Sequence, residues 1–201
     1  MEITTLAELR KVLNYEQRSI RGLSPIKGFW GWMRADVSFW IHPGNPTKFM
    51  YCLRCEEYFA NHRGGGKLIL KLLQYKHKKL QTATGIELRP GCAEMGVTIN
   101  HGKCVVSHGA RIGRDSVILS DVTIGGTGGD RDCGAAKIGE RCFISSGARI
   151  IGDITIADNV VVGANAVVTK SITESGITVA GVPARKINSR GSEAYISRPK
   201  L

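Results

Sequence analysis

A histidine at an irregular step of a repeat is the side chain best suited to chemistry in this sequence. His101 lies between Ile99 and Val106, which are seven positions apart, whereas the aliphatic residues after Val106 return every six positions. One extra residue therefore bulges at the turn that carries His101. An imidazole held at such a turn is available for acid–base catalysis near neutral pH. The alternative is an ordinary histidine of a surface turn.

A glycine-rich segment is the second feature that suggests a site. It runs from Gly125 to Ala136 and reads GGTGGDRDCGAA. Binding residues often lie on loops that a rigid scaffold positions. We therefore expect this segment to leave the repeat as a loop and to cover a groove beside it.

The repeat that would position these residues has a period of six, which neither a helix nor an amphipathic strand produces. Such hexads are typical of a parallel β-helix, in which a coil of eighteen residues has three short strands and three turns. Two runs share one register, and the step of fourteen positions from Ile124 to Ile138 corresponds to two hexads and two extra positions. The register contains Val106, Ile112, Ile118 and Ile124, and then Ile138, Ile144, Ile150, Ile156, Val162 and Val168.

The position four residues after each aliphatic is mostly small or β-branched, as the corner of a narrow prism requires. The hexad form indicates the left-handed, triangular kind. The fold class expected is therefore mainly β, a left-handed parallel β-helix with a small α-helical N-terminal region. The corner residues are Ser116, Val122, Cys142, Ala148, Ile154, Val160, Ala166 and Ile172.

Three regions are expected along the chain. A basic, mainly helical region covers residues 1–84, the β-helix covers 85–187, and a mobile tail covers 188–201. A capping box formed by Thr5 and Glu8 opens the first helix. The predicted helices are Leu6–Tyr15, Pro46–Ala60 and Lys67–Leu80.

The net charge of +11 lies mostly outside the repeat, since residues 1–82 carry 14 Lys and Arg against 6 Asp and Glu. A basic excess can indicate nucleic acid, an anionic membrane surface or acidic ligands, and no nucleic-acid motif accompanies it here. The basic helix at 67–80 has two interpretations. Its apolar stripe packs on the end of the β-helix, or it lies at a membrane surface. The stripe consists of Leu68, Ile69, Leu72, Leu73 and Tyr75.

The six cysteines are scattered, and Cys52 and Cys55 form a lone CxxC that is weak support for zinc. His101 and His108 are too few for a three-histidine zinc site, so no metal is expected. Free thiols, together with the lack of a signal peptide or an apolar span, suggest the cytoplasm.

Five short motifs resemble the serine acetyltransferase family, most closely its shorter branch associated with capsule and exopolysaccharide synthesis. The resemblance implies homotrimers of left-handed β-helices, acetyl-CoA as donor and O-acetylation of a hydroxyl acceptor. The motifs are TINHG at 98–102, VTIGGT at 122–127, GARIIGDITI at 147–156, VGANAVV at 162–168 and AGVPAR at 180–185.

The resemblance also implies residue roles. His101 matches the catalytic general base. Ser146 and Ala164 match positions whose backbone lines the pantetheine groove, and Gly126 and Thr127 fall where the loop meets the donor. By charge as much as by resemblance, Lys170 and Arg185 are expected to meet the phosphates of CoA.

The departures from the family pattern concern the acceptor. Glu87-Leu-Arg-Pro90 stands where the family has Asp-Ile-His-Pro, so Glu87 would orient His101 in place of the aspartate. Arg131 is retained as an acceptor contact, but the histidine that follows it in the family is Asp132 here. These changes favour a sugar hydroxyl as the acceptor, in capsule or exopolysaccharide synthesis. The enzyme is then expected in the cytoplasm, in peripheral contact with the inner face of the membrane. The alternatives are L-serine acetylation for cysteine biosynthesis, a non-catalytic scaffold, and a zinc hydrolase or lyase.

Overall fold

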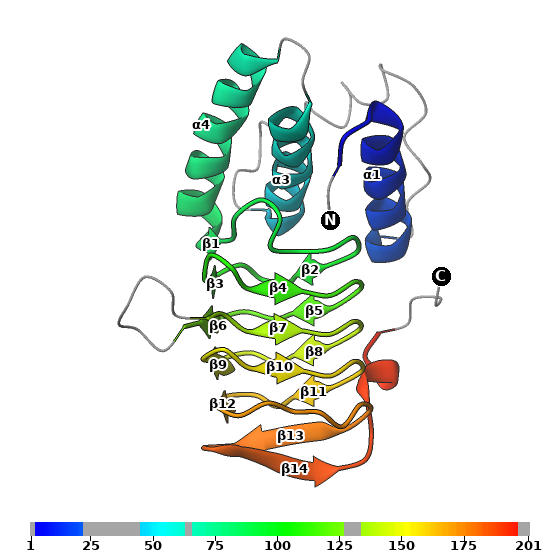
Figure 1. Cartoon of the computed structure of the whole chain (residues 1–201), viewed down its shortest axis with the longest axis vertical. Helices are drawn as coiled ribbons and strands as arrows, with labels where there is room; N and C mark the ends of the chain where they lie inside the picture. Colours follow the sequence, from blue (N-terminus) through cyan, green and yellow to red (C-terminus); the bar gives the residue numbers. More distant parts are fainter. Residues whose placement is uncertain (1–2, 22–44, 63–65, 127–133, 197–201) are drawn as a thin grey trace.

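Three helices stand on one end of a parallel β-helix in the computed structural model (Figure 1), which describes residues 3–21, 45–62, 66–126 and 134–196. The helices are α1 (Leu6–Arg21), α3 (Pro46–Asn61) and α4 (Lys67–Thr84). The capping box is confirmed, because Glu8 N donates to Thr5 Oγ1 at 3.2 Å and Thr5 N donates to Glu8 Oε2 at 2.9 Å. All three predicted helices are present, and α1 and α4 continue beyond their predicted ends.

The β-helix has three faces, each formed by strands that repeat once per coil. The first sheet has the order β1-β3-β6-β9-β12, the second β10-β7-β4 and the third β14-β13-β11-β8-β5-β2. Among the described strands, only the β13–β14 pair is antiparallel. The bounds are β1 (Ile86–Glu87), β2 (Thr98–Ile99), β3 (Cys104–Val106), β4 (Arg111–Ile112), β5 (Val117–Ile118), β6 (Val122–Gly125), β7 (Lys137–Ile138), β8 (Phe143–Ile144), β9 (Arg149–Ile151), β10 (Thr155–Ile156), β11 (Val161–Val162), β12 (Val167–Val168), β13 (Thr178–Gly181) and β14 (Ala184–Asn188).

The predicted inward positions form the core. All ten aliphatic residues of the register are buried, and the corner residues are buried too except Ile172, which is half-buried. Hydrophobic side chains from successive coils therefore stack into one continuous column. Each coil is stabilised by contact with its neighbours and would not be stable alone. The predicted parallel β-helix is confirmed.

Strand pairing shows where the repeat departs from eighteen residues per coil. Val106 pairs with Ile124, eighteen positions on, whereas Ile124 pairs with Ile150, twenty-six positions on. The interruption therefore adds eight residues at a single corner, between β6 and β7. The spacing of the aliphatic residues predicts instead two further hexads with two extra residues, which is wrong. Ile99 pairs with Ile118, nineteen positions on, which confirms the extra residue near His101.

The helical region is joined to the first coil by a fully buried arginine. Arg54 of α3 is 0% exposed and donates to the backbone carbonyl oxygens of Ala93 at 2.9 Å and Glu94 at 2.6 Å. The same guanidinium forms ion pairs with Glu16 of α1 at 2.9 Å and with Glu57 at 3.0 Å. Burial raises the pKa of the Glu16 carboxyl, and the charge of Arg54 opposes this rise.

The two carboxylates and a histidine reach the same coil. Glu57 accepts a hydrogen bond from Gly91 N at 2.8 Å, and Glu16 accepts one from Gly96 N at 3.2 Å. Buried His77 of α4 lies 3.1 Å from the carbonyl oxygen of Leu88 through Nε2, and its Nδ1 contacts Glu56. Side chains of the helices thus bond backbone groups of the first coil that have no coil above them.

The apolar stripe of α4 does not pack on the β-helix, contrary to the first interpretation of the sequence. Of its five residues only Leu73 is packed against the core, and the other four are exposed. The residues of α4 that are buried lie on another side of the helix and are His77, Leu80 and Thr84.

The tail after residue 188 was expected to be mobile, but its described part packs on the third sheet. Ser192 and Ile196 are buried, and the ring of Tyr195 stacks on Phe143 with centroids 4.7 Å apart. The division of the chain at 84 and 187 stays a prediction.

Replacing Arg54 tests whether its network stabilises the fold. We expect Arg54→Ala to lower the free energy of unfolding by about 3–5 kcal/mol, because it leaves two buried carboxylates without their counter-charge. Urea unfolding measures this loss, and Arg89→Ala, at an exposed arginine, is the control expected to change stability by less than about 0.5 kcal/mol. Equal stability of the two variants would contradict the assigned role.

Burial also predicts the reactivity of three thiols. It raises the pKa of Cys52, Cys104 and Cys142 to about 12. At pH 8 only about one in 10⁴ of each would be thiolate, the reactive form. We expect iodoacetamide to leave these three residues unmodified in the native protein and to modify them in urea, as measured by peptide mass spectrometry. Rapid labelling in the native protein would show that the helices and coils open readily.

Candidate active site

His101, Ser146 and Ala164 lie along one edge of the prism, where each strand of the third sheet turns into the first sheet. We call this the His101 edge. Successive turns are bonded to one another, since Gly147 N donates to Ser120 O at 3.0 Å and Asn165 N donates to Ser146 O at 3.0 Å. The structure thus brings three predicted site residues into one line. The edge consists of residues 100–103, 119–121, 145–147 and 163–165.

The turn at His101 has an unusual backbone. His101, Gly102 and Lys103 have φ angles of 69°, 71° and 50°, three consecutive left-handed residues. The other turns of the edge have one such residue each, at Asp121, Gly147 and Asn165. A left-handed conformation costs about 1–2 kcal/mol for a residue with a Cβ, and such strain is concentrated at functional sites.

The end of α4 holds this turn in place. Lys103 N donates to Thr84 O at 3.0 Å, and a Cβ added at Gly102 would lie 2.5 Å from the same oxygen. Only glycine therefore fits between His101 and Lys103 without moving the chain. The imidazole of His101 itself is exposed, so it can reach a substrate.

Glu87 lies on the outer face of the first sheet, one strand from the turn. It is exposed, and β1 places it beside Val105 of β3. Within the described chain no hydrogen bond or ion pair joins Glu87 to His101. The role of Glu87 as the residue that orients His101 therefore stays a prediction.

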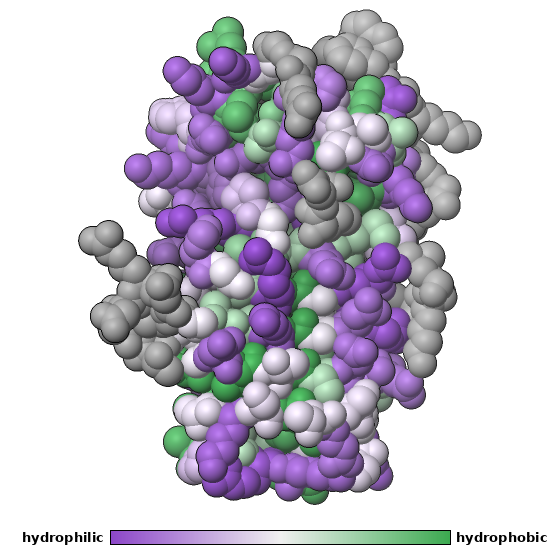
Figure 2. All heavy atoms as spheres, in the orientation of Figure 1, coloured by the Kyte–Doolittle hydropathy of each residue, from purple (hydrophilic) through white to green (hydrophobic). Residues whose placement is uncertain are grey.

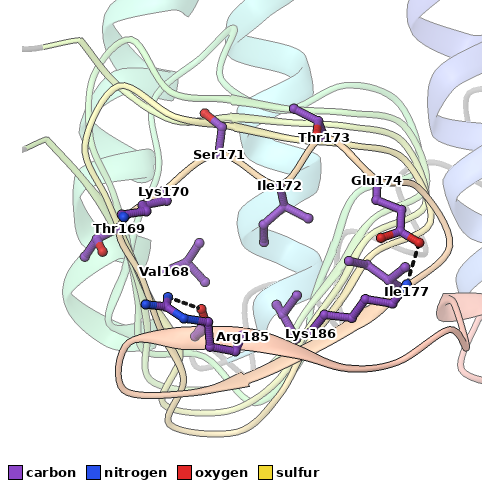
Figure 3. Close-up of a pocket in the computed structure, with 12 residues that line it drawn as sticks. Val168, Thr169, Lys170, Ser171, Ile172, Thr173, Glu174, Ile177, Arg185 and Lys186 are labelled. Carbon is purple, nitrogen blue, oxygen red and sulfur yellow. Dashed lines mark hydrogen bonds and ion pairs between the residues drawn. The ribbon is translucent and has the colours of Figure 1, made fainter.

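Lys170 and Arg185 line one hollow at the far end of the β-helix (Figure 3), with a volume of about 460 Å³. The two cations lie on the same side of it, and Val168 and Ile172 point into it. On the opposite side, Lys186 Nζ pairs with Glu174 at 2.5 Å. An apolar floor with two cations at one rim suits a ligand that carries both a ring and phosphates.

The glycine-rich loop starts at a different edge, between the first and second sheets. Gly126 follows β6 and is half-buried, whereas Thr127 and Arg131 lie outside the described residues. Lys170 follows β12 and occupies the same edge two coils further on. The described site residues therefore frame the outer face of the first sheet, with His101 on one side, Gly126 and Lys170 on the other, and Glu87 on the face itself.

Arg149 is a further residue of this face that the sequence did not single out. It follows Thr123 in the ladder of the first sheet and bonds the carbonyl and, at 3.1 Å, the carboxylate of Asp121 on the His101 edge. Arg149 directly precedes Ile150, which points inward, and neighbouring residues of a strand point to opposite faces. The sequence could therefore have predicted that Arg149 points outward. Arg149 thus places a guanidinium, paired with Asp121, on the framed face close to the His101 edge.

The described residues contain no group of three or more His, Cys, Asp and Glu side chains that could hold a metal ion. Across the same residues, no helix is both long and apolar enough to span a bilayer.

Comparison with known proteins gives one family model and several relatives. Residues 135–170 match the family described as bacterial transferase hexapeptide (six repeats). A serine acetyltransferase of Staphylococcus xylosus is 41% identical over 111 residues, which are 54% of this chain and 50% of that protein. The chain thus spans about half the length of this curated relative.

Solved serine acetyltransferases have a similar structure. One in complex with CoA gives a TM-score of 0.65 at 24% identity, over 90% of this chain and 71% of that one. The enzyme of Neisseria gonorrhoeae in complex with serine gives 0.67 at 23% identity, over 91% and 70%. Residues 135–170 therefore match the hexapeptide repeat of bacterial transferases, and the chain has the fold of the serine acetyltransferases, a left-handed parallel β-helix.

Proposed function

We propose that this protein is an acetyl-CoA-dependent O-acetyltransferase of the serine acetyltransferase type, with His101 as its general base. The observation that carries the proposal is the strained, exposed turn of His101 at the edge shared with Ser146 and Ala164. The relatives named above are acetyltransferases by name, and one of them is in complex with CoA.

The proposed reaction needs one proton to move twice. His101 takes the proton of the acceptor hydroxyl while that oxygen attacks the carbonyl carbon of the thioester. The tetrahedral intermediate then collapses, the C–S bond breaks, and the sulfur of CoA takes the proton from the imidazolium. A positioned base of this kind contributes about 10²–10⁴-fold to the rate. Glu87 would keep the imidazole in the required orientation.

The donor would lie along the framed face. The backbone at Ser146 and Ala164 would line the pantetheine arm, Gly126 and Thr127 would contact it from the loop, and Lys170 and Arg185 would bind phosphates. The side-by-side position of the two cations supports the last assignment, because neither has a carboxylate partner among the described residues.

L-serine is the better supported acceptor, in contrast to the sugar favoured by the sequence. The curated relative is named for serine acetylation, and a structural neighbour is in complex with serine. A sugar hydroxyl, as in capsule or exopolysaccharide synthesis, is the second candidate. It is favoured by Glu87 and Asp132, which replace two residues on the acceptor side of the family pattern, and Arg131 would contact either acceptor.

Assembly and location are part of the same proposal. A homotrimer would place a neighbouring prism against the framed face, where Val105 is 43% exposed, and would turn that face into a groove. The enzyme would act in the cytoplasm, in peripheral contact with the inner face of the membrane through α4.

His101→Ala is the direct test of the mechanism. We expect the rate of CoA release from acetyl-CoA to fall by about 10²–10⁴-fold, with CoA still bound, because only the proton acceptor is lost. His108→Ala, at the exposed turn histidine seven residues on, is the matched control and should keep full activity.

The same assay, run with L-serine and with a panel of sugars and nucleotide sugars, identifies the acceptor. Turnover on serine alone would support the first candidate, and turnover on a sugar alone would support the second. An unchanged rate in His101→Ala, or CoA binding without turnover on any acceptor, would favour the non-catalytic scaffold.

The cationic rim of the hollow gives a second test. We expect Lys170→Ala or Arg185→Ala to raise the KM for acetyl-CoA by about tenfold, or about 1.4 kcal/mol, since each removes one charge-assisted contact to a phosphate. The effect should shrink at high salt. Lys186→Ala, on the opposite rim and paired with Glu174, is the control. If all three variants have the same KM, the phosphates bind elsewhere.

A further inference from the structure

Helix α4 exposes a group of large apolar side chains. Leu68 is 72% exposed, Ile69 47%, Leu72 61% and Tyr75 64%, and these four account for four of the nine exposed large hydrophobic residues of the described chain. We call these four residues the α4 outer face. Single exposed hydrophobic residues are common on soluble proteins, but a contiguous group marks an interaction site.

The spacing shows that this face is continuous and that the fold does not use it. Leu68, Leu72 and Tyr75 are separated by four and three residues, so they lie on one side of the helix. The opposite side, with His77 and Leu80, is buried against α3 and the first coil. The α4 outer face is therefore exposed although α4 is already packed against the rest of the molecule through its opposite side.

Positive charge surrounds the apolar residues. The helix has no Asp or Glu, and the ammonium of Lys79 lies 5.5 Å from the centre of the Tyr75 ring. Figure 2 shows hydrophobic and hydrophilic residues mixed on the surface over α4. The lysines of the helix are Lys67, Lys71, Lys76, Lys78 and Lys79.

We propose that the α4 outer face docks on an anionic phospholipid surface. An apolar stripe flanked by lysines lies in the boundary between headgroups and acyl chains, where the lysines meet lipid phosphates. Nucleic acid would meet the same charges but would leave the leucines and Tyr75 without a partner. A second α4 would bury the leucines but would bring lysines together without any carboxylate of the helix to neutralise them.

The position of the face in the molecule suits such contact. The first turns of α4 point away from the β-helix (Figure 1), and the His101 edge and the hollow belong to the coils below. Docking would therefore leave the proposed active site accessible. The inference sharpens the proposed membrane contact to one face and one lipid class, and no step of acetyl transfer enters it.

Vesicle flotation of the full chain tests the proposal. The probes are vesicles of phosphatidylcholine with about 30% phosphatidylglycerol, and vesicles of phosphatidylcholine alone, each at low and high salt. We expect binding to the anionic vesicles only, and weaker binding at high salt. Leu68→Ser/Leu72→Ser and Lys71→Glu/Lys78→Glu should each reduce binding by about tenfold or more.

Matched controls lie far from α4. Val182→Ser/Ile187→Ser removes two exposed apolar residues at the opposite end of the molecule, and Lys137→Glu reverses a charge on the second sheet. Both should bind vesicles as the unmodified chain does. Since the α4 residues and Lys137 lie outside the proposed machinery, turnover on a soluble acceptor should be equal in the α4 variants and in Lys137→Glu, which separates this inference from the proposed function.

Three outcomes would overturn the proposal. The first is no binding to anionic vesicles. The second is binding that the leucine variant leaves unchanged, which would indicate general attraction of a basic protein. The third is a lower molecular mass of the leucine variant in sedimentation without lipid, which would assign the face to contact between copies of the chain.

Discussion

The first coil of the β-helix has no coil above it, and buried Arg54 supplies the bonds that a further coil would have made. In the coils below, backbone groups pair with the coil on either side. In the first coil, the carbonyl oxygen of Ala93 accepts a hydrogen bond from Arg54 instead, and that of Glu94 accepts one from Arg54 and one from Val97 N. A buried backbone group without a partner costs about as much as a lost hydrogen bond, so an open end of the prism would be unstable. The ion pairs with Glu16 and Glu57 keep the guanidinium charge compensated, and the three helices become part of the β-helix core.

The same junction determines the shape of the candidate site. The turn of His101 belongs to the first coil and is bonded to Thr84, the last residue of α4. Three left-handed residues in succession would relax in a free loop, because two of them carry a Cβ. They persist because the helix end lies against Gly102 and because Arg54 and His77 hold the coil that contains the turn. Stability of the helical region and geometry of His101 are thus coupled.

The sequence predicted the parts of the molecule that repeat, and it failed where contacts depend on residues far apart in the chain. Inward positions recur every six residues, so the core and the bulge at His101 could be derived by counting. The contact of Arg54 with Glu16 spans 38 residues and follows no period, and nothing in the local sequence predicts it. The packing of the α4 stripe could not be derived from the sequence, because both sides of that helix carry apolar residues and only the tertiary structure shows which side is covered. The sequence predicts the place of the insertion before Ile138. The number of extra residues at that corner follows only from the pairing of Ile124 with Ile150.

Under the proposed function, this division between regular and irregular parts would let donor and acceptor recognition vary separately. Ser146, Ala164 and Lys170 lie at turns of regular coils, where position follows from the period and a change would disturb the stacking of the prism. His101 lies at the turn with one extra residue, Glu87 lies in the first strand, and Arg131 belongs in the sequence to the insertion after Gly126. Glu87 is exposed, so a substitution there leaves the core column untouched and would cost little stability, and under the proposed function it would act through the orientation of His101. Changes at Glu87 and Asp132, where this sequence departs from the family pattern, would therefore allow an acceptor other than that of the relatives.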